Sequence, residues 1–223
     1  MFKHLIEVLD QSLSIKFVTK NLKTYYPYTK TIMKKTIILL SFALLNTAVF
    51  AQTTWKNDPM HSKLGFTITH LMVSDVDGIF KDFSCTIVAS KPDFSDAKFQ
   101  LTVNTASVNT DVDYRDKDLK TASYFDVANF PTITFTSTGI NAVATNHYKL
   151  SGNLTLHGVT KPVTMDLWYR GTITNPMSKK DDAGFKLTGV IKRSDFNFAP
   201  QAGSTMLSDE ITINANGEFG KVN

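Results

Sequence analysis

Most of the chain after residue 52 consists of stretches in which apolar and polar residues alternate one by one. In residues 63–70, apolar residues and one histidine share one side of an extended chain, while a lysine and threonines share the other. The first side carries Leu64, Phe66, Ile68 and His70. A period of two is that of a β-strand with one buried face. The sequence therefore predicts a half-buried strand here, with the His70 imidazole pointing inward.

The same alternation recurs along the chain, and each recurrence predicts another strand with one apolar face. The members of these faces are Ala97, Phe99, Leu101 and Val103; Ile133 and Phe135; Tyr148, Leu150, Leu154 and Leu156; Val163, Met165, Leu167 and Tyr169; Phe185, Leu187 and Ile191; and Ile211 with Ile213. Shorter strands are expected at residues 76–80 and 85–89. The pattern as a whole predicts about eight strands.

Residues that break regular structure separate the alternating runs. They cluster at residues 91–93, 158–162, 175–176 and 181–184, where glycine, proline and aspartate or asparagine favour turns. Connections this short join antiparallel neighbours, and no long helix is expected that would connect parallel strands. The fold class is therefore all-β, an antiparallel meander. A sandwich and a closed barrel both satisfy this pattern, and periodicity alone does not choose between them.

One charged insert, residues 110–120, has the spacing of a short helix instead. Thr110 is suited to the helix start, and Arg115 lies on the side that would pack on the protein body. Asp116 is expected to face water. The simplest role for the insert is a lid on one end of the β-structure, with Arg115 and Asp116 in local ion pairs.

The N-terminal part of the chain predicts export. Residues 33–51 combine two lysines, an apolar run and small residues near the end, which is typical of a secretory signal peptide cleaved before Gln52. The apolar run is short for a membrane span, which needs about 20 residues. Residues 1–32 have no core pattern and are interpreted as an extension from a wrongly chosen start. Residues 52–223 are expected to form a single domain.

Removal of the leader changes the charge of the protein. The chain has 24 basic and 20 acidic residues; residues 1–51 hold seven lysines and two of the acids, which leaves 17 basic and 18 acidic residues. The net charge of the remaining domain is then −1. No basic patch argues for nucleic acid as a partner or for attraction to anionic membranes.

Few side chains suggest chemistry. Cys85 is the only cysteine, so no internal disulfide forms, and its strand position favours a small buried side chain. His61 and His70 differ by an odd number and would point to opposite faces of one strand. No metal-binding motif, nucleophile elbow or phosphate-binding loop is present in the sequence. We therefore expect no metal, no cofactor and no catalytic residues, and His70 is most simply a hydrogen-bonded core histidine.

Several motifs in a fixed order resemble the YceI-like family of periplasmic polyisoprenoid-binding proteins, which have a lipocalin-like barrel. The motifs are DPMHSKLGFTITHL (58–71), VDGIFKDF (76–83), SVNT (107–110), RDKDL (115–119), SYFDVANFPTITF (123–135), LTLHGVTKPV (154–163) and RSDF (193–196). They span almost all of the chain after residue 53. Their common order makes the resemblance more specific than any single motif.

The resemblance implies an up-and-down barrel of about eight strands in the periplasm that encloses a polyisoprenoid or a related long-chain amphiphile, such as an isoprenoid quinone or its precursor. A barrel of this size is either filled by side chains or able to hold one ligand. Transient membrane contact for lipid exchange and a homodimer are further expectations. The implied lining of the cavity is Leu64, Phe66, Ile68, His70, Phe99, Leu101, Val103, Phe135, Leu154, Leu156, Met165, Leu167, Tyr169, Phe185 and Leu187, with Arg115 and Asp116 as polar contacts at the mouth.

Two alternatives stay open from the residues themselves. Composition alone favours an ordinary packed core over a cavity, and the resemblance reverses this preference. The second alternative is a small isomerase or hydrolase whose chemistry is done at the barrel mouth by His70, Arg115 and Asp116.

Overall fold

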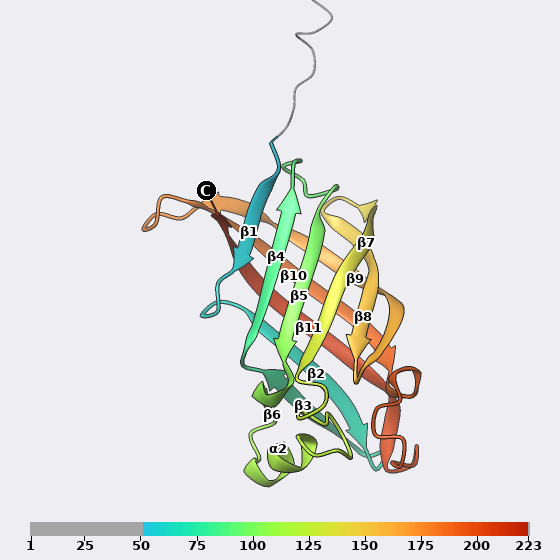
Figure 1. Cartoon of the computed structure of the whole chain (residues 1–223). Coiled ribbons are helices and arrows are strands. Elements are labelled where there is room, and N and C mark those ends of the chain that lie inside the picture. The colour runs from blue at the N-terminus through green and yellow to red at the C-terminus, as the bar shows by residue number, and fades with distance from the viewer. Residues whose placement is uncertain (1–50, 223) are drawn as a thin grey trace, which may run out of the picture. The chain divides into compact units, whose positions relative to one another are not determined.

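A computed structural model describes residues 51–222 of the chain. In it, eight antiparallel strands form a closed barrel (Figure 1). The barrel closes because β1 pairs with β4 on one side and with β11 on the other. Its strands are β1 (Thr53–Asn57), β4 (Phe83–Ala89), β5 (Lys98–Asn104), β7 (Thr132–Ala144), β8 (His147–Leu156), β9 (Val159–Thr174), β10 (Asp181–Lys192) and β11 (Leu207–Val222). The expected leader and the preceding extension lie outside the described residues, apart from Ala51.

Three more strands extend the sheet at one end of the barrel. The long strand β11 pairs with β1 through its last residues and with β2 (Lys63–His70) through its first. Strand β2 in turn pairs with β3 (Ser74–Phe80), and β3 with the short β6 (Val108–Asn109). Strands β2 and β3 thus continue the wall of the barrel from the same edge of β11 that pairs with β1 at the closing seam.

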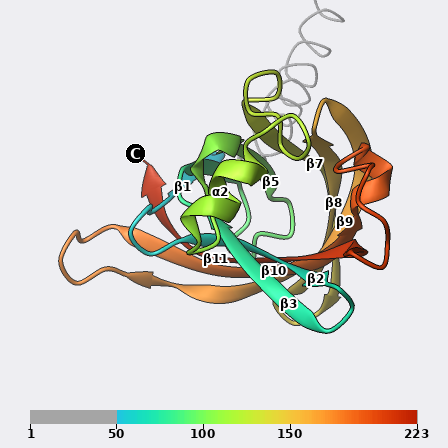
Figure 2. The same cartoon turned by 90° about the horizontal axis from the view of Figure 1, so that it is seen from below.

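Helix α2 (Asp113–Leu119) lies across this widened end, as Figure 2 shows from below. It is the one α-helix of residues 51–222, and two 3-10 turns, Thr105–Ser107 and Arg193–Phe196, accompany it at the ends of strands. The predicted insert is therefore present. Its start differs from the prediction, because Val112 takes the capping position and makes no side-chain cap.

Two predicted turns are wrong in extent. The turn after β8 is only His157 and Gly158, both with positive φ, and Pro162 lies inside β9. Proline is tolerated there because this part of β9 pairs with β8 alone, so its missing N–H costs no ladder bond on the other side. Residues 181–184 also belong to a strand, because β10 begins at Asp181 and pairs there with β9, beyond a bulge at Arg170 of β9, and with β11.

The end of the barrel opposite α2 is closed by aromatic packing. Phe94, almost fully buried, lies with its ring centre 5.3 Å from Trp55, 4.9 Å from Tyr169 and 5.0 Å from Phe185. The Tyr148 hydroxyl donates to the Asp93 carbonyl and ties the same loop to β8. Aromatic side chains at these separations pack as a solid layer. None of the helices in the described range is long and apolar enough to span a bilayer.

Candidate functional site

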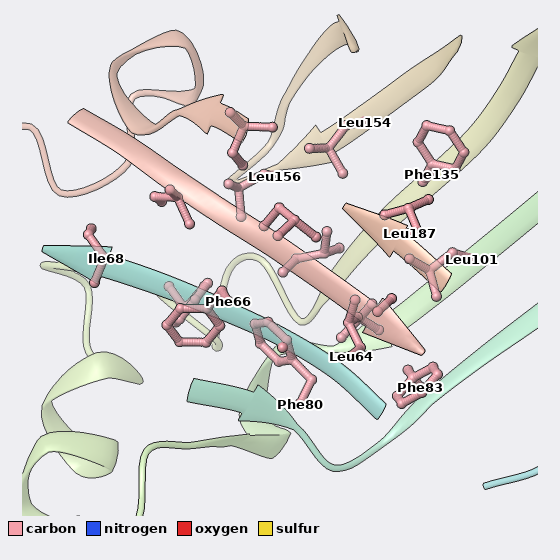
Figure 3. Close-up of a pocket in the computed structure, with 18 of the residues that line it drawn as sticks. Leu64, Phe66, Ile68, Phe80, Phe83, Leu101, Phe135, Leu154, Leu156 and Leu187 are labelled. Carbon is pink, nitrogen blue, oxygen red and sulfur yellow. The ribbon is translucent and has the colours of Figure 1, made fainter. Parts of the chain in front are cut away.

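The barrel is hollow between the aromatic plug and helix α2. The cavity has a volume of about 480 Å³, within the range of about 300–1,000 Å³ that is usual for small-molecule sites. Its wall is almost entirely apolar, and Figure 3 shows leucine and phenylalanine side chains from several strands converging on the same space. An ordinary packed core, favoured by composition alone, is therefore not what the side chains form.

The structure places fourteen of the fifteen lining residues inferred from the sequence on the cavity wall. These are Leu64, Phe66, Ile68, His70, Phe99, Leu101, Val103, Phe135, Leu154, Leu156, Met165, Leu167, Phe185 and Leu187. Tyr169 is not on this wall. Its ring belongs to the plug beside Phe94, and its hydroxyl bonds with that of Thr172. Alternation identified the correct face of β9, but not how far along the strand the cavity ends.

The wall also has members that were not predicted. Among the additional lining residues are Val76, Phe80, Phe83, Cys85, Tyr114, Leu119, Tyr124, Phe125, Leu150, Ile191, Phe198, Leu207, Ile211, Ile213 and Phe219. Several of them continue the inward faces of predicted strands, so the period of two could have identified them. Tyr124, Phe125 and Phe198 come from loops, where no periodicity points to a cavity.

Inward-facing glycines help to keep the barrel hollow. A side-chain carbon at Gly78 would collide with the Phe66 ring on the neighbouring strand, and one at Gly152 would collide with the Phe135 ring. The two rings therefore lie against bare backbone rather than standing out into the lumen. Space is left in the middle of the barrel because large side chains sit beside positions that have none.

The cavity reaches the surface beside helix α2. His70, Tyr114 and Asp118 all border the cavity and are exposed to solvent. Arg115 lies beside them, half-buried, and its guanidinium donates to the Thr110 hydroxyl and carbonyl, both at 2.8 Å. The mouth therefore combines an apolar interior with a few polar groups at the rim, an arrangement that suits an amphiphilic ligand.

Asp116 was predicted to face the solvent or the mouth, and the structure shows that it faces neither. Its side chain is buried and accepts hydrogen bonds from the Thr110 N–H at 2.8 Å, from the Thr110 hydroxyl at 2.6 Å and from the Asn109 amide at 3.2 Å. No direct ion pair with Arg115 is formed, since both side chains bond to Thr110 instead. Asp116 therefore fastens helix α2 to the segment after β6.

The predicted core position of His70 is also wrong, because the side chain is exposed at the end of β2. The alternative of an enzyme at the mouth required His70, Arg115 and Asp116 to act together. Asp116 is committed to Thr110 and Asn109, so that set is not assembled at the mouth. Within residues 51–222, no group of three histidine, cysteine or acidic side chains is placed to hold a metal ion.

Cys85 lies on the inward face of β4, as predicted, and borders the cavity. Burial in apolar surroundings raises the pKa of its thiol from an ordinary value of 9.0 to about 12. The thiol is therefore protonated at neutral pH and behaves as a small apolar wall residue.

Comparison with known proteins gives one family. The family model described as a YceI-like domain matches residues 55–219. Protein YceI from Salmonella agona (strain SL483) is 38% identical over 189 residues, which cover 83% of this chain and 98% of the relative.

Solved structures share the fold. The Campylobacter jejuni YCEI protein is 35% identical and superposes with a TM-score of 0.64, over 70% of this chain and 91% of that one. A polyisoprenoid binding domain from Saccharophagus degradans superposes with a TM-score of 0.57 over 75% of this chain and 97% of its own. Its identity is 17%, and at that level the likeness shows the fold alone.

Proposed function

Because this chain belongs to the YceI-like family, we propose that it is an exported binding protein that encloses a polyisoprenoid, or a related long-chain amphiphile, in its barrel for carriage or storage. The observation that carries this proposal is the apolar cavity of about 480 Å³ with a single plugged end. The family and the polyisoprenoid binding domain among its structural neighbours support a lipid-binding barrel. Isoprenoid quinones and their precursors belong to the class of ligand that we propose.

The energetics of the wall favour a long apolar tail over a polar substrate. Each buried methylene contributes about 0.8 kcal/mol, so ten of them contribute roughly 8 kcal/mol. That is about micromolar affinity before the cost of ordering the tail is subtracted. Binding then depends on tail length more than on specific hydrogen bonds. We infer weak selectivity for the head group.

The head group of the ligand would lie at the mouth. Arg115 and Tyr114 border the opening there, and Arg115 is held in place by its two bonds to Thr110. A fixed guanidinium is a suitable partner for a phosphate or an oxygen-rich ring. The proposal gives this arginine a positioning role and requires no bond to be made or broken.

The proposed place of action is the periplasm. It rests on the leader at residues 33–51. In that compartment the protein would take lipid from one membrane and release it at another site, which requires transient contact with a bilayer. Mass spectrometry of the exported protein tests both expectations for the N-terminus. A chain that retains residues 33–51 would contradict the cleaved leader, and a chain that begins before Met33 would contradict the wrongly chosen start.

Solvent extraction tests the binding itself. The barrel is purified from exporting bacterial cells without detergent, extracted with organic solvent, and the extract is analysed by mass spectrometry. We expect a long-chain isoprenoid in a ratio near one per barrel, and none from an unrelated protein purified in parallel. An empty extract, together with no uptake of added polyprenol, would refute the proposed function.

A further inference from the structure

Four apolar side chains stand exposed beside the cavity mouth. Leu71, Met72 and Val73 form the turn between β2 and β3 and are 54%, 61% and 83% exposed, and Met206 beside them is 52% exposed. A hydrogen bond of 2.9 Å from the Leu71 N–H to the Met206 carbonyl holds the two segments together. We refer to these four residues as the mouth tip. Figure 1 shows the β2–β3 turn and helix α2 at the same end of the barrel.

The backbone of the turn makes these residue types unexpected. Leu71 and Met72 both have positive φ, at 52° and 60°, and the Val73 N–H donates to the His70 carbonyl across them. A turn of this type favours glycine, asparagine or aspartate at its two central positions. Here the chain has two large apolar residues instead, in a strained conformation and in contact with water. Neither local conformation nor packing within the barrel accounts for this choice.

The mouth tip is continuous with the cavity wall. His70 immediately precedes it, and Leu207 immediately follows Met206; both border the cavity, and they pair with each other across β2 and β11. An apolar ligand that leaves the cavity at this point passes directly onto the tip without crossing water. The surface is therefore placed where transfer between the barrel and a lipid phase would occur.

Size and charge decide which partner fits. A stable protein interface takes about 20–30 residues on each side, so four side chains are too few for a second copy of the chain. The segment between Leu64 and Phe80 carries Asp75 and Asp77 and no lysine or arginine, and Asp209 follows the second part of the tip. Acidic neighbours disfavour an anionic membrane. What fits is shallow insertion into a bilayer of neutral head groups.

We propose that the mouth tip docks the barrel on a neutral phospholipid bilayer by insertion of Leu71, Met72, Val73 and Met206, so that the cavity mouth faces the lipid phase during exchange. This inference rests on the proposed lipid-binding function and adds to it the surface through which exchange occurs.

The test compares two exposed apolar hairpins of the same barrel. One variant combines Leu71→Ser, Met72→Asn and Val73→Ser; asparagine suits the positive φ at position 72, so the turn is expected to form. The matched control combines Ile173→Ser and Met177→Ser in the β9–β10 hairpin, where the two side chains are 65% and 88% exposed. This hairpin lies at the end of the barrel away from α2 (Figure 1). Residues 52–223 of each are mixed with phosphatidylcholine vesicles, and bound protein is measured by flotation.

We expect the mouth-tip variant to lose at least about tenfold in vesicle binding, while the control binds as the unchanged barrel does. Circular dichroism and the amount of extractable lipid should be the same in all three, and Met206→Ser alone should give a smaller loss in the same direction. Each of three results would overturn the docking proposal. They are equal binding of the two variants, no binding of the unchanged barrel to neutral vesicles, and a change from dimer to monomer in the tip variant. Those results leave the lipid-binding function standing, because that function is refuted by an empty extract together with no uptake of added polyprenol.

Discussion

The carboxylate of Asp116 in helix α2 accepts two hydrogen bonds from a single residue, Thr110, through the backbone N–H at 2.8 Å and the hydroxyl at 2.6 Å. The guanidinium of Arg115 donates to the same threonine, to its hydroxyl oxygen and to its carbonyl oxygen. Thr110 thereby links the helix to the strand that precedes it. This clip anchors a helix that has no side-chain cap at its start, and it holds Arg115 at the rim of the cavity.

Replacement of Asp116 by alanine is expected to destabilise the barrel. The Thr110 N–H and hydroxyl would lose their acceptor in a buried place, at a cost of about 1–3 kcal/mol. The measurement is the free energy of unfolding in urea. Asp113→Ala serves as the control, since it removes an exposed acid of the first turn at about 0.3–1 kcal/mol. Equal losses in the two variants would show that the clip adds nothing beyond the helix dipole.

Arg193→Met is expected to loosen the loop at residues 197–206. The buried guanidinium donates to five carbonyl oxygens, among them those of Ala199 at 2.8 Å and Ala202 at 2.7 Å. Methionine fills much of the volume but offers no donor, so several carbonyls lose their partner at about 1–3 kcal/mol each where they stay buried. Hydrogen exchange should accelerate in this loop and little elsewhere. Lys192→Met, at the exposed last residue of β10 immediately before Arg193, should leave exchange unchanged.

The strands could be predicted from the sequence because their faces differ in polarity. Residues 63–70 alternate without interruption, and β2 has those bounds. Strand β1 was missed because it is short and shows its pattern mainly at Trp55. It closes the barrel through pairing with β4 and β11, which are distant in sequence, and no local pattern reports such pairing. The choice of a barrel therefore came from family resemblance and not from periodicity.

The site could be predicted only in part for a related reason. Alternation shows which side chains point inward, but not whether they fill the space between them. That depends on which positions oppose each other across strands, such as Phe66 over Gly78. The burial of Asp116 was likewise hidden, since a charged residue in a short charged helix ordinarily faces water, and only the fold brings Thr110 and Asn109 around it.

The buried thiol of Cys85 is expected to make the barrel less stable as the pH rises above 9. Its pKa rises from 9.0 to about 12 because of burial, so the folded chain keeps a proton that the unfolded chain loses. The associated stability is fully present below pH 9 and is lost between pH 9 and about 12, at up to about 1.4 kcal/mol per pH unit. Other groups titrate in the same window, so the measurement is the difference between the unchanged barrel and Cys85→Ala. Parallel pH profiles for the two proteins would contradict the expectation.

A bulky residue placed inside the barrel should block the ligand without unfolding the sheet. Ala215 lies on the cavity wall in β11, and Asn214 beside it is exposed on the outer face. Ala215→Trp projects an indole into the lumen, where displacing two methylenes of a tail costs about 1.6 kcal/mol, or roughly tenfold in affinity. Titration with a fluorescent polyprenol should show this loss, while Asn214→Trp binds as the unchanged barrel does. If Ala215→Trp retains full affinity while its circular dichroism is unchanged, the ligand does not occupy this cavity.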